Sequence, residues 1–148
     1  LCEECSSRYI RRIVEAVQDE YFMVILHNCG NTVNLVPSLV GTGSMGLHFG
    51  NAVDMRDILP QVPADRVAFG NVDPARVFKN GSASEVFDVT TGLLENTRQF
   101  TNFVLSSGCD VPPGTAEENV NAFFRALRKY NNKVICDTVQ SDENAYLA

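Results

Sequence analysis

Three Gly-Asn pairs divide the first half of this sequence into regular steps. They are Gly30-Asn31, Gly50-Asn51 and Gly70-Asn71, and successive pairs lie 20 residues apart. A short apolar run precedes each pair, and Gly with Asn is typical of the turn that leaves a strand. Two such common loop residues can recur by chance. If the turns are real, strands that alternate with helices form a parallel sheet, and all these turns lie on one rim.

The first apolar run, Tyr21–Leu26, contains no charged residue and is rich in aromatic and branched side chains. Such a run, closed by Gly30, predicts a strand buried on both faces. His27 and Cys29 follow where this strand is expected to end. Metal-binding side chains at the exit of a buried parallel strand are typical of the active sites of α/β proteins.

The remaining expected elements alternate along the chain, which we predict to be a single domain over residues 1–148. Helices are predicted over Glu3–Gln18, Thr32–Val40, Asp54–Leu59 and Ala116–Tyr130, and a further long helix is predicted to run to about Thr101. Asp54 is expected to cap the third of these helices, and either Ser82 or Ser84 to cap the long one. Strands are predicted over Met45–Phe49, Arg66–Phe69 and Phe103–Ser106. Residues 131–148 have the weakest pattern, and we expect this tail to be irregular or a short strand.

Composition excludes several classes of function. The net charge is −6 and no cluster of Lys and Arg occurs, which argues against a nucleic-acid surface. No apolar run approaches the roughly 18–20 residues that span a bilayer, and no secretory signal opens the chain, so we expect a cytoplasmic protein without a membrane segment. Five cysteines, an odd number, favour reduced thiols or metal ligands over disulfides. The sequence begins with Leu1, and we expect it to be either a piece of a longer protein or a processed chain.

Unusual side chains gather at the expected strand ends. They are His27, Cys29, Asn31, His48, Asn51, Asn71, Asp73, Cys109 and Asp110. One imidazole and two thiolates form a ligand set for zinc, and three protein ligands leave a position open for substrate. We therefore predict a metal site at His27, Cys29 and Cys109, with no catalytic residue beyond it. Cys2 and Cys5 form a CxxC pair, but no second pair accompanies it, and ordinary residues at a helix start are the better interpretation.

The other rim residues have less specific roles. His48 is either a fourth ligand, a partner of the ligands or an ordinary rim histidine. Asn31, Asn51, Asn71 and Asp73 are predicted to line the substrate pocket, although Asp73 before Pro74 is more typical of a turn cap than of a base.

Four segments together resemble a known family. They read HNCGN, HFGNAVDM, VAFGNVDP and GCDVPPGTAEENVNAFFRA. This set resembles the uroporphyrinogen decarboxylase superfamily, and most of all its corrinoid-dependent branch, which includes the methylcobalamin:coenzyme M methyltransferases. Residues from Leu1 to Tyr130 are similar to the carboxyl-terminal half of that family's TIM barrel. The resemblance implies an α/β fold of about four βα units, strands five to eight of the barrel.

The resemblance also implies a site. The methyltransferase branch carries zinc on an H-x-C motif and a distant Cys, a pattern that matches His27, Cys29 and Cys109. The decarboxylases need no metal and have a His in a GHG-like turn, where this chain has Gly108-Cys109-Asp110. In some relatives an acidic residue near the sixth strand completes the zinc sphere, whereas this chain offers His48 and Asn51 there.

The implied function is zinc-dependent transfer of a methyl group between a corrinoid, carried by a partner protein, and a thiol such as coenzyme M. A tetrapyrrole carboxy-lyase of the uroporphyrinogen decarboxylase type is the first alternative. The second is a non-catalytic half-barrel. Half of a barrel leaves two sheet edges unpaired, so we expect the isolated chain to be inactive. We also expect it either to pair with a second copy or another segment, or to close its sheet differently.

Overall fold

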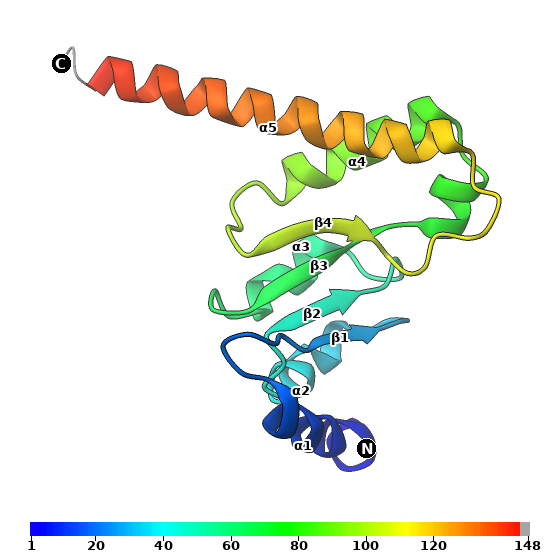
Figure 1. Cartoon of the computed structure of the whole chain (residues 1–148), viewed down its shortest axis with the longest axis vertical. Helices are drawn as coiled ribbons and strands as arrows, with labels where there is room; N and C mark the ends of the chain where they lie inside the picture. Colours follow the sequence, from blue (N-terminus) through cyan, green and yellow to red (C-terminus); the bar gives the residue numbers. More distant parts are fainter. Residues whose placement is uncertain (146–148) are drawn as a thin grey trace.

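Four parallel strands form one sheet in the order β1-β2-β3-β4 (Figure 1). We analysed a computed structural model, which describes the backbone of residues 1–145 and the side chains of residues 1–135. The strands are β1 (Ile25–Asn28), β2 (Gly46–Phe49), β3 (Val67–Val72) and β4 (Phe103–Ser107). Neighbours in sequence are neighbours in the sheet, and each pairing is parallel.

Helical segments connect successive strands. Before β1 lie a π-helical turn (Glu3–Ser7) and α1 (Arg8–Val17). The connections between strands contain α2 (Val36–Val40), α3 (Met55–Ile58), a π-helical turn (Pro74–Lys79) and α4 (Ala83–Asn96), and α5 (Glu117–Ala145) follows β4. A parallel sheet in sequential order with helical crossovers is the arrangement of part of a (βα)8 barrel. The predicted fold class is therefore confirmed.

Two buried clusters hold the helices against the sheet. The first packs Leu47, Phe49 and Ala68 of the middle strands against residues of α2 and α3. The second joins Val72 at the end of β3 to Phe123 of α5 and to residues of α4. Burial of these apolar side chains is the main contribution to folding. Both clusters lie on the side of the sheet that the helices cover, so they fix the strands without occupying the rim.

Local capping signals are realised as the sequence predicts. The Asp54 side chain accepts a hydrogen bond from the backbone N–H of Arg56 at the start of α3. Asp73 accepts from two backbone N–H groups in the turn after β3, and Ser82 accepts from Glu85 at the start of α4. Each contact satisfies a backbone donor that has no partner within the helix.

The prediction of a buried strand over Tyr21–Leu26 is wrong. The strand begins only at Ile25, and Tyr21 and Phe22 are 88% and 57% exposed. The Asp19 carboxylate accepts hydrogen bonds from the backbone N–H groups of Tyr21 and Phe22, which holds these residues in a turn. Within the described residues β1 has a strand neighbour on one side only. The apolar run therefore predicted correctly that a strand follows, but not where it begins or how far it is buried.

The prediction of an irregular tail is also wrong for residues 131–145, which continue α5. This stretch contains neither Gly nor Pro, so nothing in it ends a helix. Lys133 of α5 forms an ion pair with Glu95 of α4 at 2.9 Å, and the two helices lie side by side in Figure 1. Residues 146–148 of the expected tail lie outside the described residues. Among the described helices none is both long and apolar enough to cross a membrane.

Candidate metal centre

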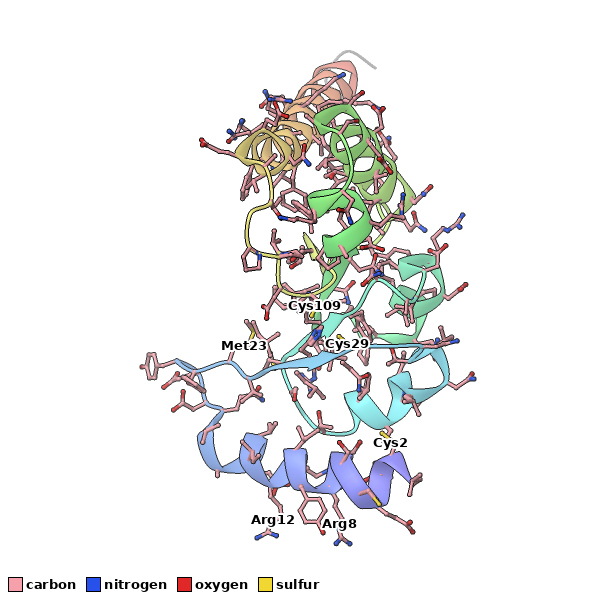
Figure 2. All side chains as sticks on the ribbon, turned by 90° about the vertical axis from the view of Figure 1, so that its right-hand side faces the viewer. Cys2, Arg8, Arg12, Met23, Cys29 and Cys109 are labelled. Atoms are coloured by element: carbon pink, nitrogen blue, oxygen red, sulfur yellow. The ribbon has the colours of Figure 1, made fainter. Side chains whose placement is uncertain are left out.

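Three side chains with metal-binding atoms meet at the carboxyl end of the sheet. His27 lies in β1, Cys29 follows β1 directly, and Cys109 lies two residues beyond β4. Their ligand atoms all lie within 4.8 Å of one another. His27 Nε2 is 2.8 Å from Cys29 Sγ, and the two sulfur atoms are 3.8 Å apart. Figure 2 shows Cys29 and Cys109 together at the middle of the molecule. The structure thus brings together the three predicted ligands, which come from the two edge strands of the sheet.

The edge strands can meet because two glycines remove side chains from between them. A Cβ at Gly50, after β2, would lie 3.2 Å from Cys29 Cα and 3.6 Å from the carbonyl oxygen of Gly108. A Cβ at Gly108 would lie 2.7 Å from the backbone nitrogen of Asn51, a distance that real Cβ atoms do not show. The turns after β1 and β4 therefore both close onto the turn after β2. This close approach gives the Gly-Asn pair a role that the sequence alone did not reveal.

The sulfur–sulfur distance suits a zinc ion, and the nitrogen–sulfur distance is shorter than zinc requires. Two sulfur ligands of a tetrahedral zinc, each bonded at about 2.3 Å, lie about 3.8 Å apart. The Cys29 and Cys109 sulfur atoms are 3.8 Å apart. A nitrogen and a sulfur ligand would lie about 3.6 Å apart, so His27 and Cys29 need to separate by about 0.8 Å. Because both side chains are exposed, a small rotation of either provides that shift.

The Cys109 sulfur affects the protonation of the Cys29 thiol. Cys29 donates a hydrogen bond to Cys109 Sγ, and this contact raises the pKa of the Cys29 thiol. Slight desolvation and the nearby charges of Cys109 and Asp110 act in the same direction. Two adjacent thiolates repel each other, so the protein without a cation favours at least one protonated sulfur. A bound cation would remove this repulsion.

His48 lies beside the three ligands without joining their cluster. Its ring centroid is 4.6 Å from that of His27, the residue directly opposite in the β1–β2 pairing. His48 Nε2 is 2.7 Å from the carbonyl oxygen of Ser107, at the end of β4. The half-buried ring is therefore in contact with both edge strands.

The four residues predicted to line the substrate pocket make different contacts. Asn51 donates a hydrogen bond to the Asp73 carboxylate at 2.9 Å and lies against Gly108, next to the metal ligands. Asp73 also caps the turn after β3. Asn71 directs its amide to the carbonyl oxygens of Gly50 and Val53, so it fixes the turn after β2. Asn31 is exposed.

Cys2 and Cys5 lie apart from the cluster of His27, Cys29 and Cys109. Cys2 is 3.6 Å from the Ser7 hydroxyl at the amino-terminal end of the first helix, and Figure 2 shows it well separated from Cys29 and Cys109. Cys5 is exposed in the same segment. The side chain of Cys136 is not among those described. The CxxC pair therefore adds nothing to the centre.

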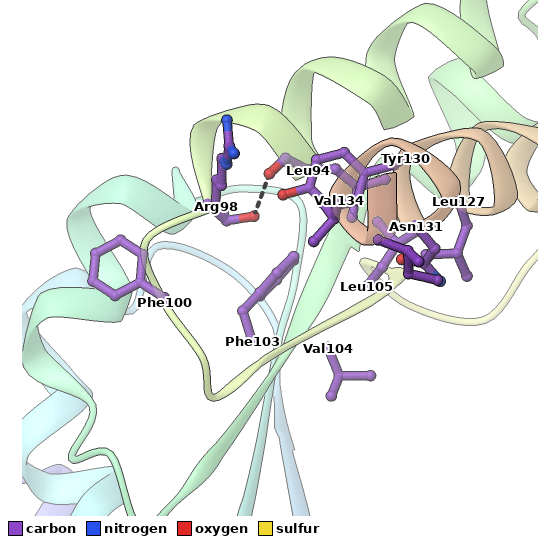
Figure 3. Close-up of a pocket in the computed structure, with 12 residues that line it drawn as sticks. Leu94, Arg98, Phe100, Phe103, Val104, Leu105, Leu127, Tyr130, Asn131 and Val134 are labelled. Atoms are coloured by element: carbon purple, nitrogen blue, oxygen red, sulfur yellow. Dashed lines mark hydrogen bonds between the residues drawn. The ribbon is translucent and has the colours of Figure 1, made fainter. Parts of the chain in front are cut away.

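An apolar cavity of about 600 Å³ lies elsewhere, between α4, β4 and α5 (Figure 3). Its walls include Phe103 and Leu105 of β4 and Leu127 of α5. Most of its lining is apolar, with Arg98, Tyr130 and Asn131 among its polar members, and none of His27, Cys29 and Cys109 lines the cavity. The cavity and the predicted metal site are therefore separate features of the fold.

The chain is similar in sequence to known proteins of two kinds. The chain is 26% identical over 128 residues to a methylcobamide:CoM methyltransferase, MtbA, of Methanosarcina acetivorans, a match that covers 86% of this chain and 36% of the relative. It is 29% identical over 124 residues to a uroporphyrinogen decarboxylase of Prochlorococcus marinus, covering 82% of this chain and 34% of the relative. The chain thus spans about a third of the length of the curated relatives it matches.

A solved structure agrees in fold. A methyltransferase from Methanosarcina mazei superposes with a TM-score of 0.76 at 20% identity, covering 88% of this chain and 37% of that one. The four βα units therefore correspond to part of a larger fold. The family described as uroporphyrinogen decarboxylase (URO-D) matches residues 2–130, nearly the whole of the sheet and its helices. The chain belongs to the uroporphyrinogen decarboxylase family.

Proposed function

We propose that this chain supplies the zinc-binding part of a methyltransferase that moves a methyl group between a corrinoid and a thiol such as coenzyme M. The proposal is supported by one observation above all, the position of Cys109. Its sulfur lies 3.8 Å from that of Cys29, although 80 residues separate the two in sequence. A second thiolate at this place is what the resemblance to the methyltransferase branch requires. The decarboxylases of the family resemble this chain less at that turn.

The chain's own residues have distinct tasks in this function. His27, Cys29 and Cys109 would hold the ion, and three protein ligands would leave a position for a substrate sulfur. His27 and Cys29 are exposed, so a thiol can reach the ion from solvent. When bound, zinc would lower the pKa of that thiol, so that the nucleophilic thiolate exists at neutral pH. Cys29 and Cys109, as thiolates, would keep the net charge of the metal site low, so that a substrate sulfur there would stay nucleophilic.

The methyl donor has to approach the same rim. The ligand-bearing turns after β1 and β4 are at the carboxyl end of the strands, where barrel enzymes place their active sites. A corrinoid is too large to be enclosed by these short turns, so we infer that a separate corrinoid protein presents it over the rim. Because the chain spans about a third of its relatives, we expect turnover only together with the rest of a barrel.

Zinc binding by the purified chain tests the proposal. We expect one ion per chain, measured by competition with a chromophoric chelator, and a loss of affinity of more than about 100-fold in Cys109→Ser, beyond the range of an outer-shell change. Cys5→Ser is the matched control, because Cys5 is an exposed cysteine outside the cluster, and its affinity should equal that of the unaltered chain.

Absence of stoichiometric zinc, or equal affinities in the Cys109 and Cys5 variants, would exclude the zinc site. The result also separates the alternatives. A tetrapyrrole carboxy-lyase of this family needs no metal, so its activity would survive Cys109→Ser. A non-catalytic half-barrel would bind zinc in the same way but would show no methyl transfer from methylcobalamin to coenzyme M when the complementary part of a family barrel is added.

A further inference from the structure

His48 connects the two edges of the sheet from a strand that carries no metal ligand. It lies in β2, and β3 separates that strand from β4. Its side chain nevertheless reaches Ser107 at the end of β4, with Nε2 2.7 Å from the carbonyl oxygen. A carbonyl oxygen can only accept, so Nε2 carries the proton and donates. The contact defines the position of the β4 end relative to β2.

Ser107 transmits this contact to the cysteine. Its hydroxyl donates a hydrogen bond to the backbone carbonyl of Cys109 at 2.7 Å. Beyond Ser107 the chain turns at Gly108, whose N–H bonds to the carbonyl of Val72 at 2.7 Å. Cys109 is thus held through Ser107, and Ser107 is held by His48. Loss of the imidazole would release one support of the turn that carries the cysteine.

The same ring also contacts the histidine ligand. The His27 and His48 rings have centroids 4.6 Å apart and planes tilted by 44°. Aromatic rings at this separation pack favourably in a tilted arrangement. Because His27 is exposed, its contact with the half-buried His48 limits the orientations that its ring can adopt. One residue of β2 therefore restrains the ligands of both edge strands.

We propose that His48 is a positioning residue of the metal centre, which sets the separation of the His27–Cys29 and Cys109 turns and is not itself a ligand. This inference rests on the proposed zinc site for its functional meaning. The nitrogen that donates to Ser107 cannot bind a metal at the same time. Outer partners of metal ligands typically change affinity by about 10–100-fold when they are removed, and we expect a change in that range here.

The first test compares two variants. His48→Phe keeps a ring beside His27 but loses the donor to Ser107, whereas His48→Gln keeps an N–H donor on a side chain of similar reach. We expect zinc affinity to fall by about 10–100-fold in His48→Phe and to be largely restored in His48→Gln. Cobalt substitution adds a spectroscopic readout. The cobalt–thiolate absorption should persist in His48→Phe, since both sulfur ligands remain.

A control variant removes a comparable support from the opposite end of the sheet. The Asn102 side chain donates to the carbonyl oxygens of Pro63 and Arg66, and so ties the start of β4 to the chain before β3. Asn102→Leu should lower the free energy of unfolding but leave zinc affinity unchanged when affinity is expressed per folded chain. General loss of stability is thereby separated from loss of ligand positioning.

A second readout does not depend on zinc. In a metal-free background with Cys2, Cys5 and Cys136 replaced by Ser, oxidised glutathione converts the Cys29 and Cys109 thiols into one disulfide and two reduced glutathione molecules. The equilibrium constant for this exchange measures how closely the two turns approach. We expect it to fall at least about tenfold in His48→Phe and to recover in His48→Gln, in parallel with the zinc affinity.

The outcomes are distinct. If the unaltered chain binds no zinc but the disulfide equilibrium falls in His48→Phe, the proposed function fails and the positioning role stands. If zinc binds and neither quantity changes in His48→Phe, the inference is overturned. It is also overturned if His48→Gln behaves like His48→Phe, because the donated hydrogen bond would then have no effect, or if Asn102→Leu weakens zinc binding equally.

Discussion

The middle and the edges of the sheet differ in almost every respect that matters here. The middle strands β2 and β3 supply the buried side chains, with Phe49 and Ala68 fully inaccessible to solvent and Leu47 nearly so. The edge strands β1 and β4 are largely exposed or half-buried, and Val104 of β4 is 43% exposed. Yet all three predicted ligands belong to the edges.

The residues that stabilise the fold and the predicted metal ligands therefore lie in different strands. The middle strands contribute the core, and at their carboxyl ends they also provide Gly50 and His48, around which the edge turns close. The edges contribute the reactive side chains but little buried surface. A change in the middle should therefore affect folding first, and a change at the rim should affect metal binding first.

The largest effect on stability is expected from Phe49→Ala. Phe49 is fully buried among apolar residues of the first cluster, so its truncation leaves a cavity and should cost about 3–5 kcal/mol in the free energy of unfolding. Urea denaturation followed by circular dichroism measures this cost. A loss below about 1 kcal/mol would show that the middle of the sheet is not the source of stability.

Gly108→Ala is expected to have a smaller effect on stability and, unlike Phe49→Ala, to act on zinc binding directly. The added methyl would lie 2.7 Å from the Asn51 nitrogen, and the resulting shift of the turn should cost about 1–3 kcal/mol. Because Cys109 is the next residue, zinc affinity should fall as well, which chelator competition would detect.

Gly92→Ala is the matched control for that glycine. Gly92 lies within α4, and a Cβ there would meet nothing within 4 Å. The substitution should raise stability by about 0.5–1 kcal/mol and leave zinc affinity unaltered. Equal effects of the two Gly→Ala changes would mean that the close approach at Gly108 is unimportant.

The smallest effect is expected at the edge itself. Val104→Ala removes two methyl groups that are already partly in water, so the chain should lose only about 0.5 kcal/mol. Denaturation in parallel with Phe49→Ala makes the comparison direct. A loss as large as that of Phe49→Ala would indicate that the edge of β4 is covered in solution, as the expected pairing with a second copy would require.

The sequence predicted what depends on near neighbours. The caps at Asp54 and Ser82 and the turn at Asp73 follow from side chains that bond to backbone two or three residues away. Features set by distant residues were missed. Asn119 of α5 is buried and donates to the carbonyl oxygens of Phe78 and Gly81, about 40 residues earlier, and no local pattern announces this contact.

The same distinction applies to the site. Cys109 was selected because parallel strands end on one rim, and the structure places it beside His27 and Cys29. That they hold a metal stays a prediction. The exposure of Tyr21 and Phe22 was missed, because burial depends on which elements lie alongside. The close approach at Gly108 was missed as well, and three roles stayed open for His48, since the contacts of both depend on atoms of strands far away in sequence.

The separation of Cys29 and Cys109 by 80 residues has a consequence for how the chain folds. Bringing the ends of so long a loop together costs about 4 kcal/mol of chain entropy, so the centre can assemble only after all four strands have docked. An ion bound there would favour the folded ensemble by mass action, by about 4 kcal/mol at a free concentration 1,000 times its dissociation constant. Metal binding and the last step of folding would then be one equilibrium, and the unfolding transition would shift with the concentration of free zinc.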